Sequence, residues 1–587
     1  MNLEAKGKLR PWSISTTVRN PDRLRSFLRV LREMDGEIWN QKAQSQFQAE
    51  LIRARVYGYG EKQFYNGLSG PSVELLESDK PISSEQAAMI FEEKNYSDAP
   101  MRGRTSYKPL ERFGFAIRKE GRVRITKLGH RFLNEDSDIT DIFTRSLLKW
   151  QLPNPLDARS FRARDGYNIK PFVAALHVIA KVNERSNAQP GITLNEFQIF
   201  LLTLIDCRDI EACVADLLDY RQRSKSIKIE HIRPQFETKH LGDYADNALR
   251  YFMLSGLLER RSEGRRIDIA PLRREDVKAL LASDDACPQD FSEASYLTYL
   301  SDAAQPVLAW EDAAARTRSL ALLRETAERE GIARADLDRW AEENADIDKL
   351  RSIIAQNLVA KRKDKERLRL QKREAILDLA QQLQELPKAS DRESRSQAPL
   401  RLEMLATQAL IALNDALEIR SNAVKSATEE MLATAPGGRA DIECEYEGFV
   451  ATCEVTLSRG RQQWVQEGQP VMRHLRAFED RHVDKMAFCL FLAPTIHDDT
   501  CNTFWNSVRH AYQGKRQKIL PLTLEQFGAI LELCAECRHL GRPLAWQELL
   551  DLYQSLSAFS SEDSQDWRRS IGSKIASWTQ SVRGERQ

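Results

Sequence analysis

Several features are missing from this sequence, and each absence narrows the classes of protein to which it can belong. No apolar run reaches the roughly eighteen residues that a membrane-spanning helix needs. The first residues, MNLEAKGKLRPW, contain no apolar core of a secretory signal, so export is not expected. The phosphate-binding pattern GxxxxGK(S/T) is also missing, which argues against ATP-driven translocation.

Cysteine is sparse as well. Nine cysteines are spread over 587 residues, an odd number that favours reduced thiols over a disulfide framework and therefore a cytoplasmic protein. The pair Cys534 and Cys537 forms a lone CxxC in an apolar, helical segment. Because no second cysteine pair or histidine pair follows at zinc spacing, we interpret these two as core cysteines.

The chain is too long for one hydrophobic core, and its composition, 42% apolar and 29% charged, is typical of soluble globular domains. The net charge of +1 hides a local excess of positive charge. Ten Lys and Arg stand against two acids between Arg102 and Arg131. Such a cluster indicates either a nucleic-acid-binding surface or an ordinary solvated face.

The segment from Gly103 to Leu133, GRTSYKPLERFGFAIRKEGRVRITKLGHRFL, has the pattern of a winged helix. It predicts a short helix over 107–113 that stops at Gly114, followed by strands FAIRK and RVRIT around a turn at Glu120 and Gly121. A further helix is expected from Leu128.

The same order of elements returns between Ala245 and Leu281. A helix there stops at Gly256, and strands LLERR and RRIDIA flank a turn at Glu263 and Gly264. Two copies of one supersecondary pattern are more informative than one. Winged helices also serve as protein-interaction modules, so DNA recognition and protein interaction both stay open at this point.

The middle of the chain, from Trp310 to Leu386, is typical of long helices without turn residues. Eight basic and two acidic residues lie between Lys361 and Arg373, which indicates a solvated face, a helical hairpin or a surface along a phosphate backbone. The polar segment from Lys388 to Pro399, KASDRESRSQAP, is predicted to be a linker.

The last 190 or so residues predict an α/β domain with a mixed sheet. A helix is expected from Met404 to Met431, because Leu410, Leu413, Leu417 and Val424 are at helical spacing. Strands DIECEY and FVATCEVTLS then form a hairpin. The elements expected after it are a helix over 461–481, a buried strand KMAFCLFLAP, a helix over 500–512, a strand KILPLTL and a helix from Leu524.

This arrangement can bring four acids and a histidine together. Asp441 opens the first hairpin strand and Glu454 lies on the second, so an antiparallel pair can place both at one end of the sheet. Glu467 and His474 are two turns apart on the next helix. Glu418 is expected on the preceding helix.

One or two carboxylates with water and substrate phosphate suffice to bind Mg²⁺, which can activate water for phosphodiester hydrolysis. Each residue also has a plainer interpretation. A strand glutamate such as Glu454 is usually solvated, and a histidine such as His474 is more often structural than catalytic.

The order helix, D-x12-E-x-T hairpin, helix, buried strand resembles the restriction-endonuclease-like nuclease fold, the PD-(D/E)xK group. More closely, ADIECEYEGFVATCEVTLSRGRQQWVQEGQPVMRH resembles the catalytic stretch of the AlwI family of type IIS restriction endonucleases and related nicking enzymes. EIWNQKAQSQF, APMRGRTSYKPLERFGFAI, RVRITKLG and LLKWQLP resemble that family's recognition region.

The resemblance implies an acidic catalytic site at Glu418, Asp441, Glu454, Glu467 and His474. The first three would bind Mg²⁺, and the last two would position the water or the phosphate. Ala440 stands where the family usually has proline before the aspartate. Thr456 stands where the wider fold has a lysine, so water activation would depend on the metal and on His474 or Glu467.

We therefore expect a multidomain α+β protein. It would comprise two winged-helix-like DNA-recognition subdomains (1–150 and 151–285), a helical linker domain (286–390) and a cleavage domain (391–587). The candidate DNA contacts are Arg102, Arg104, Lys108, Arg122, Arg124, Arg265, Arg266, Arg459 and Arg461.

The expected function is that of a Mg²⁺-dependent type IIS endonuclease that cuts double-stranded DNA outside a short asymmetric site, one strand per active site. A second cut would need a homodimer or a small nuclease subunit. One alternative is a strand-specific nicking endonuclease that is the large subunit of a heterodimeric restriction enzyme. The others are a non-catalytic tandem winged-helix DNA-binding regulator and a repair nuclease without a fixed recognition sequence.

Overall fold

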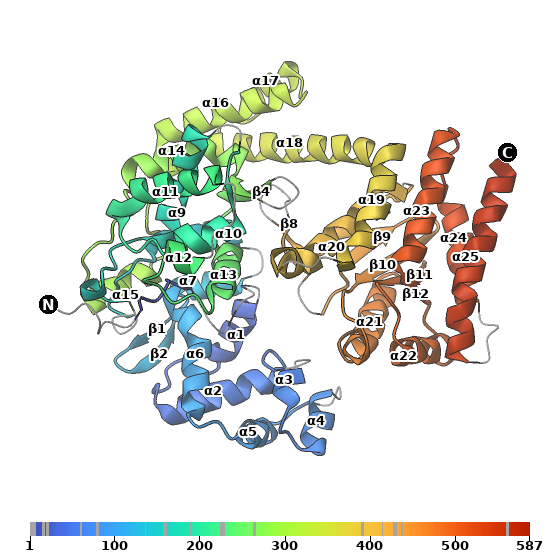
Figure 1. The fold of residues 1–587 in the computed structure, drawn as a ribbon, viewed down its shortest axis with the longest axis horizontal. Coiled ribbons are helices and arrows are strands. Elements are labelled where there is room, and N and C mark those ends of the chain that lie inside the picture. Colours follow the sequence, from blue (N-terminus) through green and yellow to red (C-terminus); the bar gives the residue numbers. More distant parts are fainter. Residues whose placement is uncertain are drawn as a thin grey trace. The chain divides into compact units, whose positions relative to one another are not determined.

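The structure is a computed structural model of the chain (Figure 1). It describes residues 8–14, 18, 21, 23–58, 62–77, 81–134, 137–156, 161–186, 189–223, 229–261, 266–388, 392–413, 415–425, 431–435, 438–558 and 563–586. The chain forms two compact units. The first is Met1–Ala355, and the second comprises Gln356–Lys425 and Met431–Gln587. The finer division into four domains stays a prediction.

The first unit is mostly helical. Its first helices are α1 (Arg23–Arg32), α2 (Gln41–Arg53), α3 (Lys62–Tyr65), α4 (Gly70–Glu77), α5 (Ser84–Glu93), α6 (Ala99–Arg112), α7 (Lys127–Leu133) and α8 (Ile139–Lys149). They are followed by α9 (Pro171–Arg185), α10 (Leu194–Glu196), α11 (Ile210–Gln222), α12 (Ile229–Ile232), α13 (Leu241–Met253), α14 (Arg274–Ser283) and α15 (Glu293–Ser301). Side-chain caps start several of them; the Asp138 carboxylate, for example, accepts from the first turn of α8.

The first predicted hairpin is present. Strands β1 (Ala116–Lys119) and β2 (Arg122–Ile125) pair antiparallel between α6 and α7. The predicted helix stop at Gly114 is confirmed, although α6 starts at Ala99, earlier than expected. Gly114 has φ +72°, and a Cβ there would lie 2.2 Å from the Leu300 carbonyl oxygen, so only glycine fits.

The second predicted hairpin is also built from antiparallel strands. Strand β4 (Leu258–Arg261) pairs with β5 (Arg266–Ile269), and the short strand β3 (Ile192–Thr193) pairs with the other edge of β5. The predicted turn at Glu263 and Gly264 lies outside the described residues. The strand pairs agree with the sequence pattern, and the assignment of both regions as winged helices stays a prediction.

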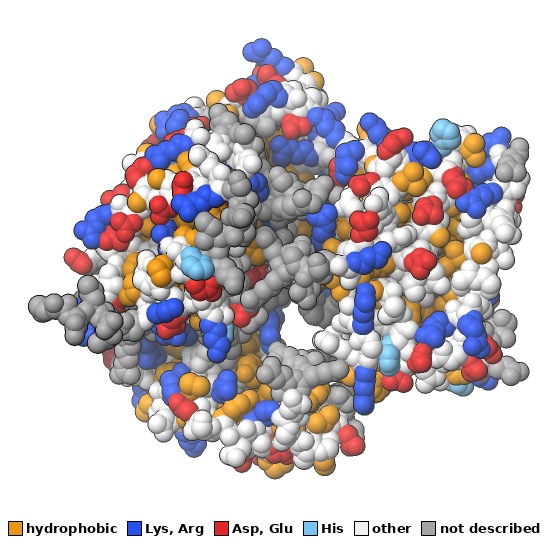
Figure 2. Space-filling view, viewed as in Figure 1, with side chains coloured by type: hydrophobic (Ala, Val, Ile, Leu, Met, Phe, Trp, Pro, Cys, Tyr) orange, Lys and Arg blue, Asp and Glu red, His pale blue; other side chains and the backbone are white. Residues whose placement is uncertain are grey.

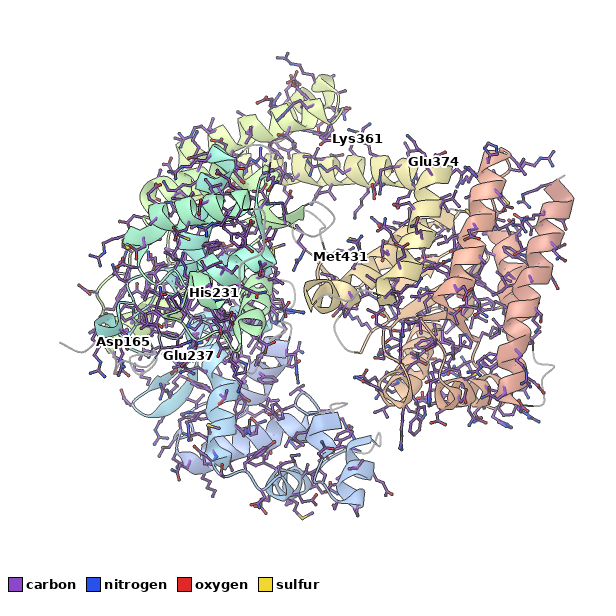
Figure 3. All side chains as sticks on the ribbon, viewed as in Figure 1. Asp165, His231, Glu237, Lys361, Glu374 and Met431 are labelled. Carbon is purple, nitrogen blue, oxygen red and sulfur yellow. A yellow bond between two sulfur atoms is a disulfide. The ribbon has the colours of Figure 1, made fainter. Side chains whose placement is uncertain are left out.

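Long helices fill the middle of the chain, as the sequence predicts: α16 (Ala313–Arg329), α17 (Arg334–Glu343), α18 (Ile347–Leu370) and α19 (Arg373–Glu385). Their surfaces are rich in charged side chains (Figure 2), and Figure 3 labels Lys361 on α18 and Glu374 on α19. The linker predicted over 388–399 is wrong in its larger part. Helix α20 (Arg392–Leu413) begins inside it and packs against α19 and α23 (Leu524–His539).

The second unit contains a mixed five-stranded sheet in the order β12-β11-β10-β9-β6. Its strands are β6 (Glu418–Ser421), β9 (Ile442–Glu445), β10 (Phe449–Val455), β11 (Met486–Ala493) and β12 (Ile519–Thr523). The neighbours of β11 are parallel to it, whereas β9 is antiparallel to β10 and to β6. A separate pair is β7 (Val424–Lys425) with β8 (Met431–Ala433).

Helices cover the sheet because its central strands are buried along nearly their whole length. Besides α19, α20 and α23, they are α21 (Arg461–Arg481), α22 (Asp498–Arg509), α24 (Trp546–Ser557) and α25 (Ser564–Arg586). In Figure 1, α21 and α22 lie on one side of the strands, and α19, α20 and α23 lie on the other. The predicted bounds of α21 are confirmed, and those of the hairpin strands agree to within a few residues.

The helix predicted from Met404 to Met431 is wrong beyond Leu413. Asp415 has a left-handed φ of +72°, which breaks the helical path, and Glu418 then begins edge strand β6. The buried apolar face of the helix ends at Leu413, since Leu417 is 69% exposed.

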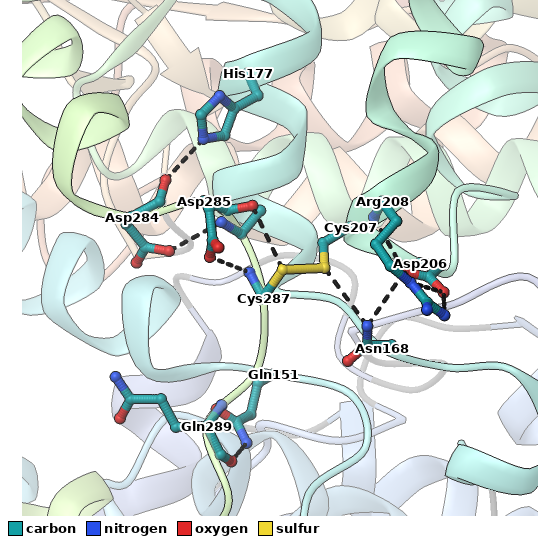
Figure 4. The surroundings of a disulfide bond; sticks show 11 residues. Gln151, Asn168, His177, Asp206, Cys207, Arg208, Asp284, Asp285, Cys287 and Gln289 are labelled. Carbon is teal, nitrogen blue, oxygen red and sulfur yellow. Dashed lines mark hydrogen bonds and ion pairs between the residues drawn. A yellow bond between two sulfur atoms is a disulfide. The ribbon is translucent and has the colours of Figure 1, made fainter.

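The expectation that all cysteines are reduced is also wrong. Cys207 and Cys287 form a disulfide in the first unit (Figure 4), while the other seven are buried free thiols. Contacts other than the disulfide also hold the loop around Cys287 in place. Lys170 Nζ pairs with Asp284 at 2.9 Å, and Lys170 N–H donates to the Ala286 carbonyl at 2.7 Å. These contacts bring two cysteines 80 residues apart in sequence to a Cα separation of 5.4 Å.

Cys534 and Cys537 are both buried among the helices of the second unit, as expected. Among the residues that the structure describes, none of the helices has the length and apolar character that crossing a bilayer requires.

Candidate active site

The β9–β10 hairpin brings Asp441 to the part of β10 that carries Glu454. In the antiparallel register, Ile442 faces Cys453, so Asp441 lies level with the end of β10. The Val455 N–H donates to Asp441 Oδ2 at 2.8 Å. This hydrogen bond ties the aspartate to the strand beside Glu454, in the arrangement that the sequence predicts.

Glu454 and Thr456 alternate with the apolar positions of the strand, and both are buried. Glu454 is only 5% exposed, which excludes the interpretation of this glutamate as part of a solvated edge. Helix α21 supplies His474, whose Nδ1 shares a hydrogen bond of 2.8 Å with Glu454 Oε1. Glu467 lies two turns earlier on the same helix, and the Thr456 hydroxyl acts to lower its pKa against the larger effect of burial.

Burial and mutual repulsion set the protonation of this cluster. Burial, with the charge of Glu454, raises the pKa of Asp441 well above its usual range, and burial with Glu467 does the same for Glu454. Burial also raises the pKa of Glu467. Burial and the charge of Arg473 lower the pKa of His474 to about 4, so the imidazole is neutral at pH 7.

Glu403 on α20 is a member of the cluster that sequence reasoning missed. It is 4% exposed, and the Ala435 N–H donates to its Oε2 at 3.0 Å. Burial and the charge of Asp441 raise its pKa to about 9. Its position in the apolar stripe of LRLEMLATQAL was the available signal, because a glutamate is rarely buried on a helix without a reason.

Glu418, expected in the site, lies elsewhere. In the sheet register it faces Glu445, at the opposite end of β9 from Asp441. Its side chain is 55% exposed and pairs with Arg420 at 3.0 Å. The reason is the early end of α20, after which the chain turns into β6 and carries Glu418 away from the acids.

The donor set of the cluster fits a hard divalent cation. Within the described part of the chain, no Lys or Arg forms an ion pair with Glu403, Asp441, Glu454 or Glu467. In the same residues, no group of three or more His, Cys, Asp or Glu side chains is placed so that it could hold a metal ion. Mg²⁺ needs only one or two carboxylates with water and phosphate, and it would offset the repulsion between these oxygens.

The turn after β10 is held by a buried glutamine. Gln463 is 0% exposed, and its Nε2 donates to the carbonyls of Ser458 at 3.0 Å and Thr495 at 2.7 Å. The His497 N–H donates to its Oε1 at 2.8 Å. This side chain joins the ends of β10 and β11, so the loop with the exposed Arg459 and the start of α21 at the exposed Arg461 have a fixed base.

The candidate DNA contacts on α6 are partly engaged within the protein. The Arg102 guanidinium lies 4.3 Å from the centroid of an aromatic ring. Arg104 pairs with Asp98 at 2.8 Å and is exposed, and Lys108 lies 3.7 Å from the buried carboxylate of Glu111.

The remaining candidates differ in exposure. Arg122 and Arg124 alternate with the buried Val123 and Ile125, so their side chains project into solvent from the hairpin. Arg266 donates to the Gly191 carbonyl at 3.1 Å. Arg265 lies outside the described residues.

Comparison with known proteins gives the class of this protein. A family model described as AlwI restriction endonuclease matches residues 111–530, and the acidic cluster lies inside that range. The chain is therefore a site-specific restriction endonuclease, a nuclease that acts on DNA. Since the match covers well over half of its length, the chain belongs to the AlwI restriction endonuclease family. No curated protein matches it.

Two solved structures show weaker likenesses. The small subunit (R.BspD6I2) of the heterodimeric restriction endonuclease R.BspD6I is 20% identical, with 33% of this chain and 96% of that one covered and a TM-score of 0.28. The BpuJ1 endonuclease binding domain, solved in complex with pyrene- and phenanthrene-modified DNA, is 14% identical. The coverage there is 52% and 98%, with a TM-score of 0.33. Both scores are below 0.5, so neither likeness establishes a shared fold.

Proposed function

We propose that the chain is a Mg²⁺-dependent type IIS endonuclease that hydrolyses one DNA strand per active site, outside the sequence that it recognises. The observation that carries this proposal is the group of buried carboxylates at the end of β9 and β10. Stability alone does not explain such a group, because each unpaired buried acid costs folding free energy. Buried, perturbed carboxylates typically mark functional sites.

We assign Asp441 and Glu454 as metal ligands and give Glu403 the place expected for Glu418. A bound Mg²⁺ would supply an activated water and offset the charge that builds on the phosphate. His474, held by Glu454, would orient that water or the phosphate through its neutral imidazole. Glu467 is suited to accept a proton, since its pKa is raised from the usual value toward neutral pH, where a general base works best.

Recognition would lie in the N-terminal region, residues 1–285, as two winged-helix-like subdomains. The exposed Arg122 and Arg124 of the hairpin are suited to phosphate or groove contacts, and Arg104 on α6 is suited to base contacts. The linker helices would separate recognition from cleavage. One catalytic cluster per chain implies that a double-strand break needs a second copy or a small nuclease subunit.

The test is incubation of the purified chain with supercoiled plasmid and Mg²⁺, followed by mapping of the ends. We expect discrete ends at a fixed offset from one short sequence, and no cleavage in EDTA. Accumulation of nicked circles without linear product would identify a nicking enzyme. Intact plasmid over a wide range of enzyme would support the regulator instead.

Asp441→Ala gives the first site-directed prediction. We expect loss of cleavage with retention of DNA binding, because Asp441 lies in the second unit and recognition is proposed for the first. Gel-shift and cleavage assays on the same preparation measure both. Unchanged cleavage by this variant would refute the proposed site.

A further inference from the structure

Two arginines stand close to the acidic cluster in sequence, one before the β9–β10 hairpin and one after it. Arg439 precedes Asp441 by two residues, and Arg459 follows Glu454 by five. Because β9 and β10 are antiparallel, the chain enters β9 and leaves β10 at the same end of the sheet. Both arginines therefore lie beyond the end of the sheet that carries the cluster.

These two arginines differ from three other cations on or beside the sheet. Arg420, Arg481 and Lys485 each pair with a glutamate of β6 or β9. Arg439 and Arg459 are both exposed, and in the part of the chain that the structure describes neither of them forms an ion pair with an acid. Their charge is available to an anion that approaches the cluster from solvent.

Hydrogen bonds fix the backbone next to each arginine. On the loop before β9, Asn422 Nδ2 donates to the Ala440 carbonyl at 2.8 Å. On the loop after β10, the Ser458 N–H donates to Thr456 Oγ1 at 3.1 Å. Both arginine side chains therefore start from backbone that is held in place, which reduces the ordering that binding a ligand costs.

The space beside each arginine is open. Gly438 precedes Arg439 and Gly460 follows Arg459, with φ of +94° and +59° respectively. A Cβ built on either glycine would meet no atom of the described residues within 4 Å, apart from the glycine itself and its two chain neighbours. A phosphate backbone can therefore approach both loops closely.

The chemistry of the cluster calls for cations at these positions. The carboxylates that would bind the metal also repel the phosphates of DNA. Positive charge at the rim offsets this repulsion, and a guanidinium is suited to it because it forms two parallel charge-assisted hydrogen bonds with one phosphate. An arginine on each loop would hold the strand from both sides and keep the bond between the two contacts over the cluster.

We propose that Arg439 and Arg459 form a phosphate clamp, which binds the phosphates on either side of the phosphodiester that is cut. This inference rests on the proposed nuclease function and deepens it by naming how the cut strand is held. Neither arginine takes part in breaking the bond; both position the substrate.

The test compares two double variants of the full chain. The clamp variant is Arg439→Gln/Arg459→Gln. The matched control, Lys515→Gln/Arg516→Gln, removes two exposed cations from the loop before β12. Since β12, β11 and β10 run parallel, this loop lies at the end of the sheet opposite the cluster. Circular dichroism and thermal unfolding check that both variants are folded.

The first measurement is single-turnover cleavage of a duplex that spans the recognition sequence and the mapped cut, at saturating Mg²⁺. We expect the clamp variant to be slower by roughly 10–100-fold, because a small misplacement of the reacting bond costs a factor of this order. Its affinity for the recognition sequence in EDTA should change little, since recognition is proposed for the first unit. The control should cut at the wild-type rate.

The second measurement replaces the phosphate on either side of the cut, one at a time, by a neutral methylphosphonate. The wild type should slow on each modified duplex, whereas the clamp variant should slow no further, because the contact is already lost. A wild-type rate in the clamp variant, an equal loss in the control, or a full additional loss on the neutral duplexes would overturn the inference. A wild type that cuts no DNA would refute the nuclease function itself, whereas the other outcomes refute only the clamp.

Discussion

Acidic residues lie toward both ends of strand β9 in the five-stranded sheet, but only those toward one end have basic partners. Glu443 in the middle of β9 and Glu445 at its end away from Asp441 each have a basic partner, Arg481 at 2.7 Å and Lys485 at 2.8 Å respectively. At the other end, Asp441 and Glu454 are buried beside further acids without any such partner among the described residues. The same strand, β9, therefore connects a neutralised surface to an uncompensated cluster.

This difference separates acids in ordinary ion pairs from acids whose burial opposes folding and needs another explanation. Ion pairs on the surface add little to stability, but they cost little as well. Buried carboxylates with raised pKa values cost folding free energy, and a protein retains them where they serve a ligand or a reaction. Substitution of the buried acids should therefore slow cleavage and raise the stability of the metal-free protein. Substitution of the paired acids should do neither.

Glu454→Gln should give the largest effect. Glutamine keeps the shape but removes the charge that would bind the metal, and a neutral amide then replaces the carboxylate that holds His474. We expect plasmid cleavage to slow by more than about 100-fold, the upper range for losing a group that only orients a ligand. Initial rates at saturating Mg²⁺ measure it.

Glu445→Gln is the matched control at the neutralised end of the sheet, and it should cut within about twofold of wild type, since a solvent-exposed ion pair contributes little. Equal rates for wild type and Glu454→Gln would remove Glu454 from the mechanism. Equal losses in both glutamine variants would point to a general effect of charge.

Glu403 and Glu418 give a second test of the same contrast. Glu403→Gln should slow cleavage by roughly 10–100-fold, because this acid lies against Asp441. Glu418→Gln should leave the rate unchanged, because its side chain is exposed and pairs with Arg420. Cleavage rates at several Mg²⁺ concentrations separate weaker metal binding from slower chemistry. The reverse ranking would restore Glu418 to the site.

The error over Glu418 shows what local sequence can and cannot predict. The hairpin and α21 follow from alternation and helical periodicity, and the strand register alone then brings Asp441 to Glu454. The end of α20 does not follow, because Leu417 continues the helical spacing of Leu410 and Leu413. Edge strand β6 exists only through its long-range pairing with β9, which no local pattern reveals.

The disulfide was missed for a similar reason. Cys207 and Cys287 meet where Lys170, which is far from both cysteines in sequence, holds the loop before Cys287 through Asp284 and Ala286. Counting cysteines contains no information about such a contact.

The smallest expected effect concerns stability without metal. A raised pKa means that the folded state holds the proton more tightly than the unfolded chain, so this contribution to stability is present at low pH and lost as the pH rises through the folded-state pKa. At pH 7 in EDTA, Asp441→Asn removes the free-energy cost of ionising a buried carboxyl beside other acids. We expect the free energy of unfolding to rise by about 1 kcal/mol, the scale of one pKa unit. Urea unfolding of the two proteins measures it.

Glu443→Gln provides the control for this gain, since it loses the ion pair with Arg481 and should bring no increase. Addition of Mg²⁺ should then stabilise the wild type but not Asp441→Asn, because only the wild type keeps both carboxylate ligands and binding to the native state shifts unfolding. A lower stability of Asp441→Asn in EDTA would mean that the Val455 hydrogen bond outweighs the repulsion. The two ends of the sheet would then differ in burial alone, and the argument that function maintains the cluster would lose its energetic basis.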